Sequence, residues 1–241
     1  MRNPLSDTIV NIPPSGIRKF FDIVSEMPHA ISLGVGEPDF DTPWHVRSEG
    51  IRSLEKGRTF YTSNSGLIEL RQEICKWYQR KYNVLYDYKT EALLTVGGSE
   101  GIDVALRAML DPGDEVIIPE PCYVSYVPCV QLIGAVPVTI ELKNENQFRL
   151  TPEELLAAIT DKTKILILAF PSNPTGAVMT KEDLEPIAKI CQEKDIYVIS
   201  DEIYSELTYG GQKHCSISSL PGMKDRTIVI NGFSKAYAMT G

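Results

Sequence analysis

The fold is decided by residues 164–200, which read KILILAFPSNPTGAVMTKEDLEPIAKICQEKDIYVIS. Two short apolar runs, residues 164–169 and 196–200, are unbroken rather than alternating, and this pattern predicts strands that are buried on both faces. Residues 180–194 lie between them and have apolar side chains at helical spacing. A strand, a helix and a second strand in this order predict two parallel strands joined by a crossover helix.

The same alternation extends in both directions along the chain. Further strands are predicted at residues 92–96, 115–118, 136–140 and 227–231, and further helices at 99–110, 123–133 and 151–159. We therefore expect an α/β fold with a mainly parallel sheet covered by helices. Apolar spacing also predicts helices at 15–26, 43–57 and 66–81, so an N-terminal helical segment should precede the sheet.

The net charge and the scattered cysteines and histidines argue against several classes of function and of site. The 241 residues have a formal net charge of -8, which gives no electrostatic reason to bind nucleic acid or an anionic membrane. The first residues lack the basic start and apolar core of a signal peptide, so a cytoplasmic protein is expected. Five cysteines and three histidines are scattered, which favours structural roles over disulfides or a metal site.

Polar and aromatic residues follow most of the predicted strands. Ligands in open α/β sheets bind beyond the carboxyl ends of the strands, so these segments should meet at one site. They are residues 97–100 (GGSE), 119–123 (PEPCY), 171–176 (PSNPTG), 201–204 (DEIY) and 232–235 (GFSK).

Each feature taken singly has a simpler explanation. The glycine pair before Ser99 could bind a phosphate at a helix N-terminus, but such a pair is more often only a turn. Asp201 at the end of an apolar strand needs a partner, or it is a helix cap. Lys235 could be a desolvated nucleophile, although most lysines are solvated surface residues.

Taken together, these residues resemble the fold-type I pyridoxal-phosphate enzymes of the class I and II aminotransferase family. The first and last matching segments look most like the prokaryotic aspartate and aromatic aminotransferases. The segments occur in family order over nearly the whole chain: 33–40 (LGVGEPDF), 61–66 (YTSNSG), 97–100, 173–176 (NPTG), 201–204 and 234–241 (SKAYAMTG).

The resemblance implies a role for each matching residue around pyridoxal 5'-phosphate. Lys235 would bind the cofactor covalently and move a proton during catalysis as general base and then acid. Asp201 would pair with the protonated pyridine nitrogen. Tyr204 and Asn173 would hydrogen-bond the 3′-oxygen, and Tyr123 would stack on the ring. No metal is implied.

The resemblance also implies phosphate, substrate and subunit contacts. The Gly98 amide, Ser99 and Ser234 would hold the phosphate, with Glu100 also among the cofactor-binding residues. Gly36 would lie near the substrate carboxylate. Tyr61 would reach the phosphate of a partner subunit, so a homodimer is expected.

Residues 1–45 are expected to form the N-terminal segment of a small domain and arm, and residues 46–241 an incomplete cofactor-binding large domain. Related chains usually continue beyond a segment like residues 239–241 with a C-terminal domain, so we expect a truncated chain. The arginines that bind the phosphate and the substrate carboxylate in the family have no match here, and neither Arg149 nor Arg226 stands at a matching place.

The expected activity is transfer of an amino group from an amino acid to a 2-oxo acid in two half-reactions through pyridoxamine phosphate. Two alternatives stay open. One is another reaction of the same cofactor, such as a carbon–sulfur β-lyase or an amino-cyclopropane-carboxylate-type synthase. The other is a non-catalytic fragment.

Overall fold

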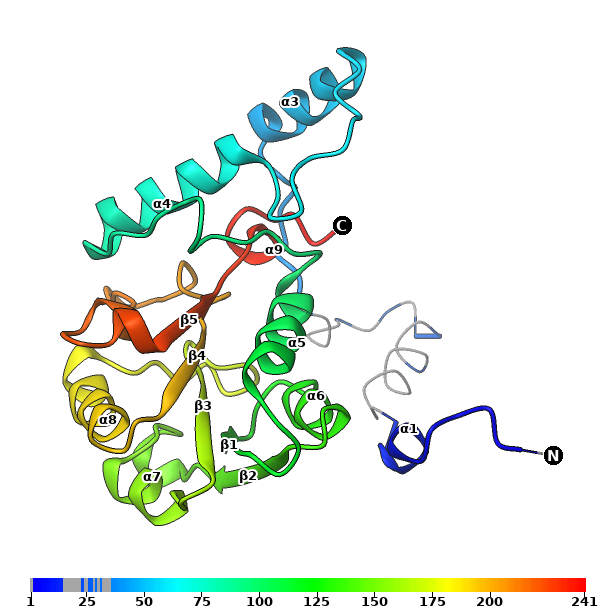
Figure 1. Ribbon diagram of the computed structural model, residues 1–241. Helices are drawn as coiled ribbons and strands as arrows, with labels where there is room; N and C mark the ends of the chain where they lie inside the picture. Colours follow the sequence, from blue (N-terminus) through cyan, green and yellow to red (C-terminus); the bar gives the residue numbers. More distant parts are fainter. Residues whose placement is uncertain (1, 15–22, 24–25, 28, 30, 32–35) are drawn as a thin grey trace.

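The computed structural model describes residues 2–14, 23, 26–27, 29, 31 and 36–241, and five parallel strands form its sheet. The strands lie in the order β2-β1-β3-β4-β5, so the strand pair of residues 164–200 lies near the middle (Figure 1). The expected parallel α/β sheet is confirmed. The strands are β1 Glu115–Glu120, β2 Val136–Glu141, β3 Thr163–Ala169, β4 Tyr197–Asp201 and β5 Thr227–Ile230.

Helices cover both faces of this sheet (Figure 1). One buried core joins α7 (Pro152–Ala158) and α8 (Lys181–Glu193) to residues such as Leu166 of β3. A second core joins α5 (Gly98–Met109) and α6 (Tyr126–Leu132) to Ile165 and Ile167 of the same strand. Successive residues of a strand point to opposite faces, so an unbroken apolar run supplies both cores.

Local capping fixes where α7 and α8 begin. Thr151 accepts a hydrogen bond from the Glu154 N–H, and the Glu154 carboxylate accepts one from the Thr151 N–H. Thr180 and Asp183 form the same reciprocal arrangement at α8. These bonds satisfy N–H groups that have no partner inside the first helical turn.

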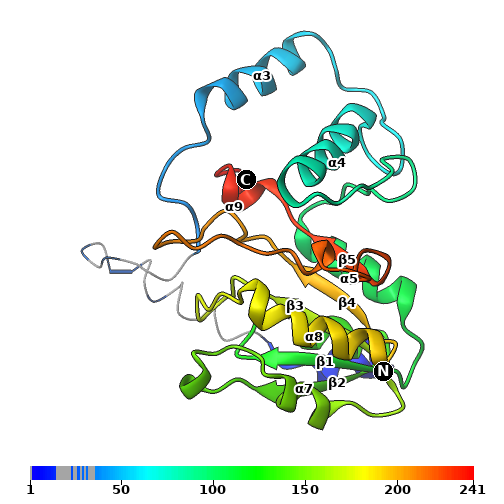
Figure 2. The ribbon, with the colours of Figure 1, turned by 90° about the vertical axis from the view of Figure 1, so that its left-hand side faces the viewer.

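The N-terminal part contributes α1 (Asp7–Asn11), α3 (Trp44–Glu55) and α4 (Ile68–Tyr82). Figures 1 and 2 place α3 at the opposite end of the molecule from β2, and α3 has no buried residue. The short helix α9 (Phe233–Ala236) follows β5. The described residues also form three 3-10 helices: η1 Asn144–Asn146, η2 Ile217–Ser219 and η3 Lys224–Arg226. None of the described helices is long and apolar enough to cross a membrane.

Two sequence expectations differ from the structure, and a third is not covered by it. Residues 92–96 form no strand: the Leu94 N–H donates to the Ser65 carbonyl, but no described strand lies alongside to complete a ladder, and Val96 is 92% exposed. The helix expected from residue 123 begins at Tyr126, after a turn. The helix expected at residues 15–26 falls almost wholly outside the described residues.

Two neighbouring leucines of α7 give a matched test of the first core. Leu155 is fully buried, whereas Leu156 is 48% exposed. We expect Leu155→Ala to lower the free energy of unfolding by about 2–5 kcal/mol, because it leaves a cavity, and Leu156→Ala to lower it by about 0.5 kcal/mol or less. Denaturant unfolding of the two variants measures both values. Equal losses would contradict the assignment of faces.

Candidate active site

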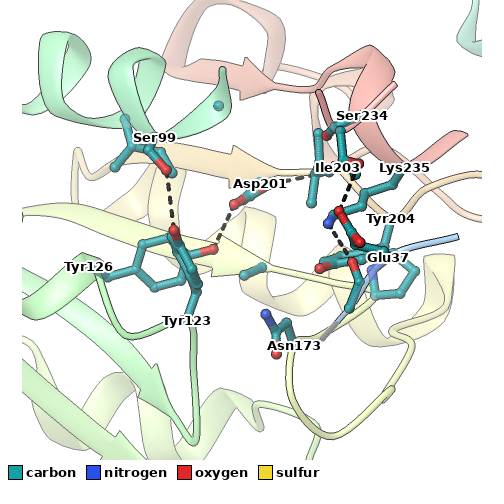
Figure 3. A pocket seen from close by; sticks show the side chains of 16 residues that line it. Glu37, Ser99, Tyr123, Tyr126, Asn173, Asp201, Ile203, Tyr204, Ser234 and Lys235 are labelled. Atoms are coloured by element: carbon teal, nitrogen blue, oxygen red, sulfur yellow. Dashed lines mark hydrogen bonds between the residues drawn. The ribbon is translucent and has the colours of Figure 1, made fainter. Parts of the chain in front are cut away.

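A cavity of about 370 Å³ opens at the carboxyl ends of the strands. Its wall combines residues from loops and helix ends that are distant in sequence (Figure 3). Nine of the residues expected at the site line it: Gly36, Gly98, Ser99, Tyr123, Asn173, Asp201, Tyr204, Ser234 and Lys235. The described chain therefore brings most of the predicted site residues together.

Asp201 is the last residue of β4, and its side chain is buried. The Tyr126 hydroxyl donates to Oδ2 at 2.7 Å, and the Ile203 N–H donates to Oδ1 at 3.1 Å (Figure 3). Burial raises the pKa of the Asp201 carboxyl, and these two hydrogen bonds oppose the rise. Among the described residues, no cation forms an ion pair with this carboxylate, so it can accept a cationic partner from the cavity.

Lys235 lies in α9, just after β5. Its Nζ donates to the Gly36 carbonyl at 2.6 Å and lies 6.0 Å from the centroid of the Tyr204 ring. A Cβ built on Gly36 would point toward the Tyr204 hydroxyl at 3.9 Å. The lysine amine is thus held at the cavity by a neutral acceptor rather than by a carboxylate.

Tyr204 lies beside Lys235 in the cavity wall, which Asn173 also lines (Figure 3). Burial and the charge of Asp201 raise the pKa of the Tyr204 hydroxyl, although the Asn173 side chain lowers it. The hydroxyl therefore keeps its proton at neutral pH and can donate a hydrogen bond.

The N-terminus of α5 forms the opposite wall. Gly97 precedes the helix with a φ of 83°, which is a conformation that favours glycine. Gly98 and Ser99 are the first helical residues, so their N–H groups have no partner within the helix. The Ser99 hydroxyl lies 3.3 Å from the Tyr123 hydroxyl. This end of the cavity is suited to an anion.

Two of the expected site residues, Glu100 and Tyr61, lie outside the cavity wall. A third residue, Tyr126, lines the cavity although the sequence did not predict it. The Glu100 carboxylate accepts a hydrogen bond from the Val96 N–H, and Tyr61 is fully exposed. Tyr126 contacts Asp201 directly but is 75 residues away in sequence. It stood inside an expected helix, where a tyrosine is an ordinary core residue, so no sequence signal distinguished it.

Comparisons with known proteins identify the family to which the chain is similar. The model of the family "Aminotransferase class I and II" matches residues 28–241. The chain is 50% identical over its whole length to the putative aminotransferase YugH of Bacillus subtilis, of which it covers 62%. It is 46% identical, over 98% of its length, to aromatic-amino-acid aminotransferase 2 of Thermococcus litoralis, of which it covers 61%.

A solved structure is similar as well. Aspartate aminotransferase of Thermus thermophilus with maleate superposes with a TM-score of 0.93 at 39% identity, over 100% of this chain and 63% of that one. The chain thus spans about three fifths of the length of the relatives that it matches.

The Tyr126 hydroxyl should stabilise the ionised form of Asp201. Because burial raises the pKa of Asp201 in the folded protein, stability falls as the pH rises through that pKa, and Tyr126→Phe should increase this loss. We expect a cost of about 1.5–3 kcal/mol at neutral pH, since one hydrogen bond to a charged group is lost. The cost should shrink as the pH approaches the usual carboxyl range. Urea unfolding at several pH values measures it, with Tyr123→Phe as the control, and a loss independent of pH would contradict this role.

Proposed function

Since the chain belongs to the class I and II aminotransferase family, we propose that it carries the cofactor-binding part of a pyridoxal-phosphate-dependent aminotransferase. The enzyme would transfer an amino group from an amino acid to a 2-oxo acid. The observation that carries this proposal is the cavity between Asp201, a buried carboxylate with no cation partner among the described residues, and the amine of Lys235.

The charged and polar groups of the cavity fit pyridoxal phosphate. A buried carboxylate is costly unless a cation meets it, and a protonated pyridine nitrogen would supply that cation. At the opposite wall, the free N–H groups at the start of α5 and the Ser99 hydroxyl suit a phosphate. Ser234 lines the cavity beside Lys235 and would be a further phosphate donor.

Bound pyridoxal phosphate would supply an aldehyde that accepts the amino group and a ring that accepts electrons. The Lys235 amine would hold the cofactor and then move the proton of the substrate Cα, as base and then as acid. The Asp201 carboxylate, kept in place by Tyr126, would keep the ring nitrogen protonated. The Tyr204 hydroxyl, whose raised pKa keeps it protonated, would donate a hydrogen bond together with the Asn173 amide.

Aromatic and glycine residues would set the positions of the cofactor ring and of the substrate. Tyr123 would cover one face of the ring, and the edge-to-face contact of its own ring with Tyr126, at 5.6 Å between centroids, supports that orientation. Gly36 would leave room for the substrate carboxylate. Glu100 would act through the turn before α5, because its carboxylate accepts from Val96 in that turn.

The wider organisation follows the same proposal. Residues 1–45 would belong to a smaller domain and arm, and residues 46–241 to the cofactor-binding domain. Exposed Tyr61 would reach the phosphate of the partner in a homodimer. Amino acids and 2-oxo acids would be the substrates, and a cytoplasmic location would keep the five free thiols reduced.

The first test is covalent cofactor binding by the protein at its natural length. With pyridoxal phosphate added, we expect a near-ultraviolet or visible absorption band and, after borohydride reduction, a mass increase on the peptide that contains Lys235. Lys235→Ala should lose both signals and lower turnover by about 10²–10⁴-fold or more. Lys194→Ala, which changes an exposed lysine, should keep them. A band that persists in Lys235→Ala would overturn the assignment.

The second test separates Asp201 from carboxylates outside the cavity. Asp201→Asn should lower turnover by about 10²–10³-fold, since it removes a charge placed to stabilise the reacting system. Asp161→Asn, at an exposed site, should leave turnover unchanged. Formation of glutamate from 2-oxoglutarate measures the rate. Release of pyruvate and ammonia from a cysteine conjugate would instead favour the β-lyase reaction.

A further inference from the structure

A second buried carboxylate lies directly behind the cavity. Glu202 follows Asp201, and its side chain is fully buried. The Glu202 N–H donates to the Ile230 carbonyl at 2.8 Å, which extends the pairing of β4 with β5 by one residue. Because successive residues of an extended strand point to opposite sides, Asp201 faces the cavity and Glu202 faces away from it. The proposed reaction gives Glu202 no role.

The partners of Glu202 come from β4 itself and from a later part of the loop that follows it. Its Oε1 accepts hydrogen bonds from Ser200 at 3.1 Å and from Ser216 at 2.6 Å. Its Oε2 lies 3.1 Å from Nε2 of His214, whose side chain is 5% exposed. Neither of these two atoms has an aligned hydrogen-bond partner among the described residues. Without an aligned hydrogen bond, an attraction between these two atoms requires opposite charges on the two side chains.

Charge balance identifies the partner that Glu202 needs. A fully buried carboxylate is strongly unfavourable unless a cation pairs with it. Among the described residues, His214 is the one basic side chain within ion-pair distance of Glu202, and Lys81 is paired with Glu206 instead. The negative charge of Glu202 also raises the pKa of Asp201, so a positive charge on His214 would limit that effect.

We propose that Glu202 and His214 form a buried ion pair that positions Asp201 and Tyr204 for the cofactor. The pair closes the loop between residues 202 and 214, in which Tyr204 lies, and it neutralises the charge next to Asp201. Both are positioning residues, because neither lines the cavity. The link to the cofactor rests on the proposed function, whereas the ion pair itself does not.

Contacts around the pair connect it to both sides of the site. The Tyr82 ring of α4 packs edge-on against His214, with 5.9 Å between ring centroids. Asn231, which stands four residues before Lys235, contacts the Ser205 hydroxyl and the Tyr78 hydroxyl, each at 3.3 Å. A displaced loop would therefore disturb the segment that leads to Lys235 as well as Asp201 itself.

A double-mutant cycle tests the pair in the protein at its natural length. The variants are Glu202→Gln, His214→Leu and the double variant, and the measurements are the dissociation constant of pyridoxal phosphate, from its absorption band, and the urea midpoint of unfolding. His214→Leu leaves a buried charge unpaired, so we expect cofactor binding to weaken by about tenfold or more and the midpoint to fall. Adding Glu202→Gln to it should restore binding by about threefold or more.

Other outcomes would overturn the proposal. If the losses of the double variant equal or exceed the two single losses combined, the residues contribute packing and not a charge pair. His45→Leu, on the exposed surface of α3, is the matched control and should change neither measurement.

A spectrum of the parent protein tests the ion pair directly, whether or not the variants fold. In protein with ¹⁵N-labelled histidine at neutral pH, we expect the His214 ring to carry protons on both nitrogens, and His214→Leu assigns the signal. A neutral ring would refute the ion pair. If the parent protein binds no pyridoxal phosphate, the proposed function fails, while this spectrum and the unfolding cycle still decide whether the pair exists.

Discussion

The burial of the Asp201 carboxylate is the constraint on which the rest of the site depends. Asp201 ends a strand in which residues 198–200 are buried, so its carboxylate cannot reach solvent without disrupting the sheet. The Tyr126 hydroxyl and the Ile203 N–H satisfy it in part. The remaining requirement is a cation from the cavity, and under the proposed function the protonated ring nitrogen of pyridoxal phosphate would supply it.

The parallel sheet brings the residues of the proposed site to one edge. Parallel strands place their carboxyl ends at one edge, so the loops after β3, β4 and β5 meet around one cavity. Helices pack against both faces of the sheet. Gly36 joins from the N-terminal part and contacts Lys235 across 199 residues of sequence. The proposed chemistry therefore needs both ends of the described chain.

Placing two carboxylates in succession at the end of β4 carries a physical cost. Asp201 and Glu202 face opposite sides, but both are buried, and the charge of Glu202 adds to the rise that burial causes in the pKa of Asp201. Under the proposed function, a cation bound in the cavity would balance the charge of Asp201. Under the inference above, His214 balances the charge of Glu202. With a separate cation for each carboxylate, Asp201 would stay charged on the cofactor side, and Glu202 would not be an unpaired charge in the core.

The sequence by itself determined the parallel α/β sheet, the helices between its strands and the segments at its strand ends, because the burial of helices and strands follows from short-range patterns. Tertiary structure alone decided that residues 92–96 form no strand, since a strand needs a neighbour to bond. It also decided that Tyr126 meets Asp201 and that His214 meets Glu202. These contacts join loops and helices whose relative positions depend on the packing of the whole domain, which no local pattern of residues encodes.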